Sequence, residues 1–370
     1  MKINLHEATW DAEEIQAVVD VLKSTRVTSG DKVREMEALF GPYAVMCNSG
    51  SSANLLAIAA LANPVNQRLK PGDGVIVSAL SWSTTVWPLV QYGLVPIIVD
   101  CDPNTLNIDP EQIKAALTNN SYPRIKAIMP VHVYGNPCDM VAIMDIAKNN
   151  DLLVIEDCCE ALGADVGNHG DMSTYSFYFS HHITTLEGGM VVAKNNDDLD
   201  LLRVLRAHGW TREMENPPHY EGLDPKFTFI NAGYNLRASE VNAAIGLIQF
   251  RKLETFVELR RKNAHILKTI FSVRPVRMQL DYGSSYFGFC LVTGRPLRKH
   301  FDAAGIETRP IICGNIARQP AMKLWEHQVV GDLRHADEVM QRGFAIPCHQ
   351  SLTDGDLDYI RASVRDFYGD

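Results

Sequence analysis

The sequence predicts an α/β fold, with a large domain built on a mostly parallel sheet and a smaller α+β C-terminal domain. Short apolar runs alternate with segments of helical periodicity, and several runs are apolar throughout, as in strands that helices cover on both faces. Beyond about residue 250 this alternation gives way to a long charged helical segment. The 370 residues are enough for two domains, which we place at 1–249 and 250–370.

The expected elements follow in chain order. Asp11, with Glu14 three residues later, forms the pattern of a helix cap ahead of apolar residues at helical spacing. Strands are expected at the apolar runs 43–47, 75–79, 96–99, 125–133, 152–155, 174–179 and 190–193. The C-terminal domain should contain a helix over about 250–271, a strand over 286–292 and a helix near 296–304. Prolines and mixed charges over 213–225 predict a surface loop.

Composition and charge argue against several classes of protein. The formal net charge is −9, whereas nucleic-acid binding needs clustered Lys and Arg for phosphate contacts. The longest apolar run, residues 55–62, is too short to span a bilayer, and the acidic N-terminus lacks the apolar segment of a signal peptide. Eight cysteines without a CxxC pair indicate reduced thiols. We therefore expect a soluble, cytoplasmic protein with no membrane or nucleic-acid partner.

An anion site is expected where the first strand meets a helix. The sequence Asn48-Ser49-Gly50-Ser51-Ser52 lies at this junction. Backbone N–H groups at a helix start, together with the helix dipole, bind phosphate. Gly50 permits close backbone approach, and the hydroxyls of Ser51 and Ser52 can donate to phosphate oxygens. Taken alone, the segment also fits an ordinary Ser/Gly turn with a helix cap.

Two further positions suit a flat nitrogen heterocycle. Trp82 follows the second expected strand, where an indole can stack on such a ring, although a core tryptophan is the simpler alternative. Glu156 and Asp157 close the apolar run 152–155. A carboxylate there can pair with the protonated ring nitrogen of pyridoxal phosphate (PLP), and a helix cap is the alternative. We assign this role to Asp157, with Glu160 as a second contact one helical turn further.

The stretch between Lys148 and Lys194 contains no Lys or Arg. It nevertheless carries a Ser-Phe-rich strand that includes Ser176, followed by His181 and His182 and then by a Glu-Gly-Gly turn. No cysteine or carboxylate stands at metal-ligand spacing nearby, so no metal site is predicted. Without the flanking motifs, the simpler interpretation of His181 and His182 is that they are core or surface histidines with no catalytic role.

Three weaker motifs offer polar groups for phosphate or sugar. The Gly-Tyr-Asn-Leu-Arg segment contains Asn235 and Arg237, and the Arg-Ala-His-Gly-Trp segment contains His208. The third, Glu-Thr-Arg-Pro, contains Glu307 and Arg309.

Taken together, these motifs resemble the PLP-dependent sugar-nucleotide aminotransferase family of fold type I, over nearly the whole chain. In that family a lysine after the Ser-Phe strand binds the cofactor covalently, and His181 occupies this position here. Two subgroups of the family share this replacement of lysine by histidine, and both resemble sugar 3-dehydratases. One of them carries an iron–sulfur cluster, bound by four spaced cysteines in the later half of its chain. Only Cys290, Cys313 and Cys348 lie beyond residue 159, so the resemblance favours the subgroup without a cluster.

The resemblance also implies roles for individual residues. His181 would be the catalytic base, Asp157 would pair with the pyridine nitrogen and Trp82 would stack on the ring. The phosphate would lie against Gly50, Ser51, Ser52 and Ser176. Active sites of this fold lie at a dimer interface, so Asn235 would reach the phosphate of the partner subunit's cofactor in a homodimer. Glu160 would contact the cofactor, and the substrate would contact His208, Arg237, Glu307 and Arg309.

The implied reaction is removal of the C3 hydroxyl from a nucleotide-linked 4-keto-6-deoxy sugar, a step of O-antigen lipopolysaccharide synthesis. L-glutamate would convert non-covalently held PLP to pyridoxamine phosphate (PMP), and ammonia would be released. Overall similarity favours GDP-4-keto-6-deoxy-D-mannose, although no single residue identifies guanine. A sugar aminotransferase with another base is one alternative, disfavoured because Lys194 lies past the Gly-Gly turn. An inert binding protein is the other.

Overall fold

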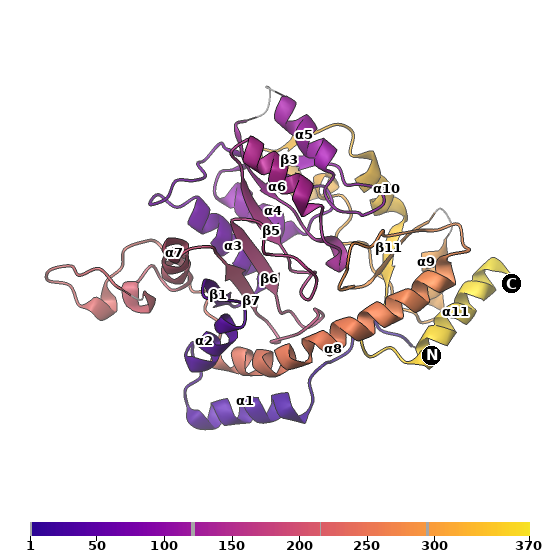
Figure 1. The fold of residues 1–370 in the computed structure, drawn as a ribbon, viewed down its shortest axis with the longest axis horizontal. Coiled ribbons are helices and arrows are strands. Elements are labelled where there is room, and N and C mark those ends of the chain that lie inside the picture. The colour runs from indigo at the N-terminus through magenta and orange to yellow at the C-terminus, as the bar shows by residue number, and fades with distance from the viewer. Residues whose placement is uncertain (1, 120–122, 215, 294–295) are drawn as a thin grey trace.

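The computed structural model describes residues 2–119, 123–214, 216–293 and 296–370 (Figure 1). Eight strands form the large sheet, and one of them, β7, runs antiparallel to both of its neighbours while the other paired strands are parallel. Their order is β1 (Ala44–Cys47), β7 (Gly189–Val192), β6 (Met172–Ser176), β5 (Leu153–Asp157), β4 (Ile125–Met129), β2 (Gly74–Ser78), β3 (Val95–Val99) and β10 (Gln328–Val329). The mostly parallel α/β sheet expected from the sequence is confirmed.

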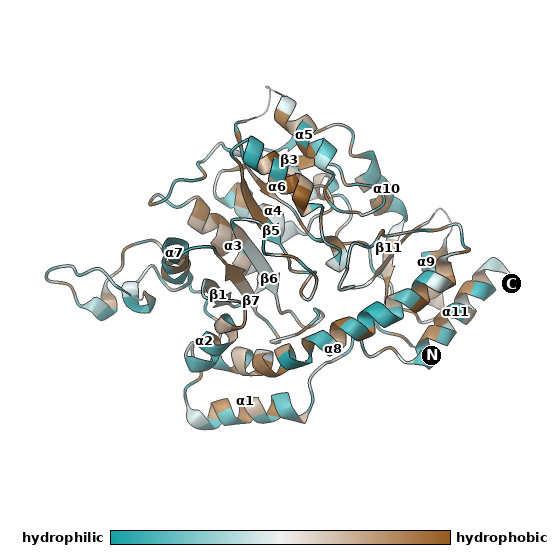
Figure 2. Cartoon of the chain, viewed as in Figure 1, coloured by the Kyte–Doolittle hydropathy of each residue, from teal (hydrophilic) through white to brown (hydrophobic). Residues whose placement is uncertain are grey.

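Helices cover this sheet, and the hydrophobic residues of the strands and of the inner helix faces form its core (Figure 2). α3 (Gly50–Leu61) is buried almost throughout, because its Ala- and Leu-rich sequence packs against β6 and β7. The other helices of this part are α1 (Ala12–Ser24), α2 (Asp31–Ala38), α4 (Ser83–Gln91), α5 (Pro110–Thr118), α6 (Met140–Asn149) and α7 (Asn196–Arg206). The predicted capping box of Asp11 and Glu14 begins α1.

The 32-residue helix α8 (Glu240–Phe271) runs from beside α1 and α2 to the C-terminal part of the chain (Figure 1). There an antiparallel sheet of β8 (Arg277–Met278), β9 (Phe289–Val292) and β11 (Gly343–Ile346) packs with α9 (Leu297–Ala303), α10 (Arg334–Arg342) and α11 (Asp354–Tyr368). The domain limits at 249 and 250 stay a prediction. They fall inside α8, and β10 from the later part joins the large sheet.

Several expected boundaries differ from the structure, and two of them by four residues or more. The long helix begins at Glu240 instead of near residue 250, because Ser239 and Asn242 form a capping box ten residues earlier. The run 125–133 is a strand only to Met129, since Pro130 has no N–H for a sheet ladder and the chain then turns through Tyr134 at φ 56°. No helix among the described residues is both long and apolar enough to cross a membrane.

Candidate active site

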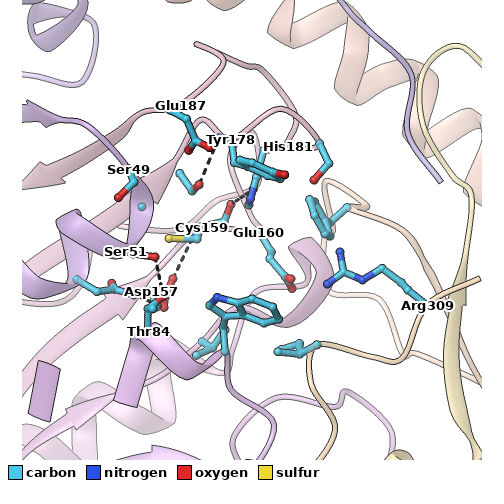
Figure 3. Close-up of a pocket in the computed structure, with 18 residues that line it drawn as sticks. Ser49, Ser51, Thr84, Asp157, Cys159, Glu160, Tyr178, His181, Glu187 and Arg309 are labelled. Atoms are coloured by element: carbon cyan, nitrogen blue, oxygen red, sulfur yellow. Dashed lines mark hydrogen bonds between the residues drawn. The ribbon is translucent and has the colours of Figure 1, made fainter. Parts of the chain in front are cut away.

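A cavity of about 420 Å³ opens where the carboxyl ends of the parallel strands meet (Figure 3). Ligands of α/β proteins bind at this edge of the sheet, because each strand delivers a loop there. The cavity is lined by residues at or after the ends of β1, β2, β4, β5 and β6, by one residue ahead of β7 and by two C-terminal segments. The lining residues are Ser49, Gly50, Ser51, Asn54, Trp82, Thr84, Val131, Asp157, Cys159, Glu160, Ser176, Tyr178, Ser180, His181, Glu187, Phe287, Arg309 and Ile312. The structure thus brings together eight of the site residues predicted from sequence.

One end of the cavity is the N-terminus of α3. Ser49 caps the helix by accepting a hydrogen bond from the N–H of Ser52, and the Ser51 hydroxyl donates to Thr84 Oγ1 at 2.9 Å. A Cβ built on Gly50 would lie 2.5 Å from Cβ of Ser176, so only glycine allows the helix start to lie this close to β6. Hydroxyls and helix-start N–H groups around a glycine cradle form the donor set that a phosphate requires.

Asp157 ends β5 in the middle of the cavity and is 3% exposed. Its Oδ2 atom accepts hydrogen bonds from Asn54 Nδ2 at 2.9 Å and from Thr85 Oγ1 at 2.7 Å. Oδ1 accepts only the N–H of Cys159, at 3.1 Å, among the described residues. A carboxylate oxygen accepts more than one hydrogen bond, so Oδ1 retains a free lone pair for a ligand's N–H.

The neighbouring carboxylate, Glu156, has a structural role. Strand alternation turns it to the other side of β5, where it is fully buried and accepts three backbone N–H groups from residues 167–170. Burial alone would raise its pKa, but the hydrogen bond and charge of His132 and these N–H groups lower the pKa of Glu156 to about 2. The choice of Asp157 over Glu156 for the cavity agrees with this geometry.

His181 lines the cavity, and its Nδ1 atom lies 2.7 Å from the carbonyl oxygen of Cys159. A carbonyl only accepts, so Nδ1 carries the proton and Nε2 of the neutral ring is the basic atom. Burial is the main cause that lowers the pKa of His181 to about 4, and the nearby charges of Arg309 and Arg260 act in the same direction, against the hydrogen bond to Cys159. The imidazole is therefore neutral, and able to accept a proton, at physiological pH.

His182 is turned away from the cavity. It is fully buried, with Nε2 3.1 Å from the carbonyl oxygen of Ser285, and burial lowers its pKa well below the ordinary range. The sequence left open which of the two histidines faces the cofactor; in the structure His181 lines the cavity and His182 does not.

Glu160 and Arg309 face each other on the side of the cavity opposite Ser51 (Figure 3). Oε2 of Glu160 accepts the N–H of Tyr134 at 3.0 Å. Burial raises the pKa of Glu160 to about 7, while Arg309 and the Tyr134 N–H oppose that shift. Glu160 can therefore exist in either protonation state near neutral pH.

The remaining predicted residues do not line this cavity. Ser52 lies one residue behind it, and its hydroxyl donates to Asn48 Oδ1. Glu307 accepts the N–H of Leu5 at 3.0 Å. The other three, which are His208, Asn235 and Arg237, lie together beside Trp210.

This second cluster is built from short local contacts. The His208 and Trp210 rings lie 4.9 Å apart, and the Arg237 guanidinium lies 5.6 Å from the Trp210 ring. Arg237 Nε donates to Asn235 Oδ1 at 3.1 Å. Asn235 was expected to serve the partner subunit's site, so its place outside this chain's own cavity agrees with that expectation without testing it.

Sequence reasoning missed the residues that orient Asp157. Asn54 and Thr85 are buried polar residues inside helices α3 and α4, where the hydrophobic pattern predicts apolar side chains. A buried Asn or Thr must find a hydrogen-bond partner, and this break in the pattern was the available signal. Thr174 completes the chain by donating to Asn54 Oδ1 at 2.6 Å.

One group of possible metal ligands occurs among the described residues, formed by His132, Glu156 and Cys158. Its ligand atoms are already engaged. Nε2 of His132 lies 3.2 Å from Glu156, and its Nδ1 accepts the N–H of Cys138 at 3.0 Å. The Glu156 oxygens are further occupied by backbone N–H groups, so the arrangement is a buried hydrogen-bond network.

Comparison with known proteins agrees with this geometry. The GDP-4-keto-6-deoxy-D-mannose 3-dehydratase of Yersinia pseudotuberculosis is 41% identical over 372 aligned residues, which cover 94% of each chain. A solved structure of the E. coli GDP-4-keto-6-deoxy-D-mannose 3-dehydratase with bound hydrated PLP matches with a TM-score of 0.92 at 38% identity, covering 98% of this chain and 100% of that one. Another, of GDP-4-keto-6-deoxymannose 3-dehydratase with a trapped PLP-glutamate geminal diamine, matches with a TM-score of 0.93 at 37% identity and the same coverage.

The match to a protein family extends over residues 8–365, which is nearly the whole chain. Both the sequence and the fold place it there, and the resemblance expected from the motifs is confirmed. The chain belongs to the DegT/DnrJ/EryC1/StrS aminotransferase family.

Proposed function

We propose that this protein is a PLP-dependent nucleotide-sugar 3-dehydratase that converts GDP-4-keto-6-deoxy-D-mannose to GDP-4-keto-3,6-dideoxy-D-mannose, with L-glutamate as amino donor. The observation that carries the proposal is His181, a neutral base with a fixed tautomer, at the cavity position where the family has lysine. The relatives of highest identity described above are dehydratases of this name.

The cavity fits PLP without a covalent link. The phosphate would bind at the start of α3, against Gly50, Ser51 and Ser176, and the ring nitrogen would donate to the free lone pair of Asp157 Oδ1. Trp82 lines the same space and is 49% exposed, which leaves its face open for stacking on the ring. Of the described residues that line the cavity none is a lysine, so the cofactor would be held by these contacts alone.

When bound, the cofactor supplies an electron sink and, after amination by glutamate, the amino group that condenses with the C4 ketone of the sugar. The residues of the chain then direct the proton. Nε2 of His181 would accept the proton from the carbon attached to the cofactor ring and would return it to the C3 hydroxyl, which would leave as water. A short imidazole held at Nδ1 by Cys159 has little freedom to swing and reprotonate sugar C4, which disfavours transamination.

The aminotransferase alternative needs another lysine near the cofactor. Lys194 lies beyond β7, and its Nζ atom donates to the carbonyl oxygen of His169 at 2.6 Å, outside the cavity. An inert binding protein would have no need of an oriented carboxylate and an oriented base in one cavity. The aminotransferase alternative does not account for the oriented His181, and the inert alternative accounts for neither His181 nor the hydrogen bonds on Asp157.

We further propose that the site is completed by a second copy of the chain. The cluster of His208, Asn235 and Arg237 presents an imidazole, an amide and a guanidinium outside this chain's own cavity, which suits contacts to a partner subunit's cofactor and substrate. A cytoplasmic location is also proposed, because all eight cysteines are free thiols, as expected in a reducing compartment.

The test is the mass of the sugar after incubation of the protein with PLP, L-glutamate and GDP-4-keto-6-deoxy-D-mannose. Replacement of the C3 hydroxyl by hydrogen, with release of ammonia, supports the proposal, whereas a 4-amino sugar or unchanged substrate contradicts it. His181→Ala should abolish dehydration while the protein still binds PLP, as followed by cofactor absorbance. Full activity in His181→Ala would exclude His181 as the base.

A further inference from the structure

Arg260 in helix α8 is a cation that is almost completely shielded from solvent, with 2% of its surface exposed. Its Nη1 atom donates to the carbonyl oxygens of Tyr286 at 2.9 Å and of Phe287 at 3.3 Å. Both acceptors belong to one turn, in which Tyr286 has φ 53° and Phe287 lines the cavity. Arg260 therefore lies behind a wall of the candidate active site without being part of its lining.

Both neighbouring histidines contact the same turn. His182 Nε2 lies 3.1 Å from the carbonyl oxygen of Ser285, which precedes the two carbonyls that Arg260 binds. The Phe287 ring lies 5.0 Å from the His181 ring and 6.1 Å from the His182 ring. One residue, Phe287, thus contacts the guanidinium through its carbonyl oxygen and the base through its ring.

The charge of Arg260 is not balanced by an ion pair with any residue in the described part of the chain. Its Nε atom also lacks a hydrogen-bond partner there. Burial lowers the pKa of Arg260 to about 10, which leaves the guanidinium protonated near neutral pH. A buried cation without a partner costs stability, and salt screens it far less than it screens a surface charge. Its field therefore reaches the ionisable groups around it.

Other ionisable groups also surround the base. They are the cavity residues Asp157, Cys159, Glu160, Tyr178, Glu187 and Arg309, together with His182 and Arg260. Groups that line the cavity meet the charges of bound ligands, so their effect on the base changes during the reaction. Arg260 is outside the lining, and its repulsion of a proton on His181 persists whatever is bound. Burial is the first cause that lowers the pKa of His181 and of His182, and the charge of Arg260 acts in the same direction on both.

We infer that Arg260 is a positioning residue for the base, whose buried charge keeps His181 unprotonated between turnovers and favours release of the proton that His181 takes up. This inference rests on the proposed function of His181. The proton from the carbon at the cofactor ring passes through Nε2 to the C3 hydroxyl, which leaves with its bonding electrons as water. An imidazolium close to a fixed cation is a stronger acid, so the second transfer is favoured.

The test compares Arg260→Gln, which keeps a hydrogen-bond donor without the charge, with Arg260→Lys, which keeps the charge. The rate of dehydration of GDP-4-keto-6-deoxy-D-mannose by PMP-loaded protein is measured at pH 5 and at pH 7. A unit charge about 10 Å away in a protein interior shifts a titration by about one pH unit. The wild type and Arg260→Lys should therefore keep about 90% of their pH 7 rate at pH 5, and Arg260→Gln about half.

A second measurement needs no sugar, so it stays valid if the proposed reaction is wrong. In PLP-loaded protein labelled with nitrogen-15 at histidine, the ring signals of His181 are identified by their loss in His181→Asn. At pH 5 they should be those of a neutral imidazole in the wild type and in Arg260→Lys, and those of an imidazole about half protonated in Arg260→Gln.

The matched control is Arg261→Gln. Arg261 is exposed and donates to the carbonyl oxygens of Ser284 and Gly283, just before the same turn. Its charge is screened by solvent, so Arg261→Gln should match the wild type in both measurements.

Unchanged behaviour of Arg260→Gln in both measurements would overturn the inference. Equal shifts in Arg260→Gln and Arg260→Lys would also overturn it, because they would assign the effect to the hydrogen bonds of the guanidinium and not to its charge. If circular dichroism shows that Arg260→Gln is unfolded, Arg260→Met takes its place, since it fills a similar volume without a buried polar group. Loss of folding in all three variants would assign Arg260 to the fold alone and would equally overturn the inference.

Discussion

The backbone of Cys159 links His181 to Asp157: its carbonyl oxygen accepts from His181 Nδ1 at 2.7 Å and its N–H donates to Asp157 Oδ1 at 3.1 Å. One residue thus sets both the tautomer of the base and the orientation of the carboxylate. Both contacts use main-chain atoms, so the relative position of the two functional groups depends on the fold of the β5 end and not on the thiol.

The first prediction concerns the pH dependence of the reaction. The base must be neutral, and burial lowers the pKa of His181 to about 4, so activity should be lost only as the pH falls towards 4. The rate of dehydration by PMP-loaded protein should therefore be flat on the acid side from about pH 7 to about pH 5. A half-maximal rate near pH 6.5, the ordinary value for imidazole, would contradict this reading of the site.

The free energy of unfolding should also depend on the titration of the buried histidines, and it should fall as the pH falls. The pKa values of His181 and His349 are both about 4 in the folded state, below the unfolded value of 6.5, so the unfolded chain binds more protons at acid pH. Their contribution to stability is complete above pH 6.5 and is lost as the pH falls, by about 1.4 kcal/mol per pH unit for each histidine. Rates should be compared only where circular dichroism shows folded protein.

The second prediction is that Gly50→Ala weakens cofactor binding. The new Cβ would lie 2.5 Å from Cβ and 3.1 Å from Cα of Ser176, which forces the helix start away from β6. A displacement costing about 2 kcal/mol corresponds to roughly 30-fold in the dissociation constant of PLP, measured by absorbance titration. The control is Gly355→Ala in α11, where the nearest atom to the new Cβ is 3.6 Å away and PLP affinity should not change.

The third prediction concerns the support of Asp157. Thr85→Val removes one of two donors to Oδ2 with little change of shape, and leaves Asn54 in place. Loss of about 1.4 kcal/mol should weaken PLP binding about tenfold. The same substitution at the exposed Thr269, whose hydroxyl donates within α8, should have no effect. Equal affinities in the two variants would show that Thr85 does not orient the carboxylate.

The fourth prediction separates the two carboxylates of β5. Glu156→Gln places an amide NH₂ where the carboxylate accepts N–H groups from residues 167–170 and from His132, and should lower the free energy of unfolding by about 3 kcal/mol. Urea denaturation measures the loss. The exposed Glu254→Gln should change it by less than about 0.5 kcal/mol. A loss of PLP affinity without a loss of stability would instead place Glu156 in the site.

The sequence was sufficient for features encoded by local patterns. The Asp11 capping box and the apolar runs of the parallel strands follow from a few neighbouring residues, and so does the capped helix start at Gly50. The family motif then identified His181 from the absence of a lysine. What the sequence could not show depends on contacts between distant segments. Arg309 is oriented by aromatic rings from two other segments, and Asp157 by donors from two different helices.

Short strands were missed for a similar reason. β10 has two residues, Gln328 and Val329, and no alternation of hydrophobicity can be read from so short a segment. It is a strand only because β3 offers a free edge beside it. The turn at Tyr134, whose N–H donates to Glu160, contains Gly135, but its first positive φ falls on the tyrosine, a residue type that gives no sequence signal for that conformation.

The late position of β10 affects how the chain acquires its fold during synthesis. Residues 328 and 329 pair with residues 97 and 98 of β3 and leave the ribosome long after them. Until then β3 presents an uncovered apolar edge, the kind of surface at which chains associate with one another. A nascent or truncated polypeptide that ends before residue 328 therefore exposes an unpaired apolar edge of the large sheet, and the last strand of that sheet to be synthesised is the one that covers it.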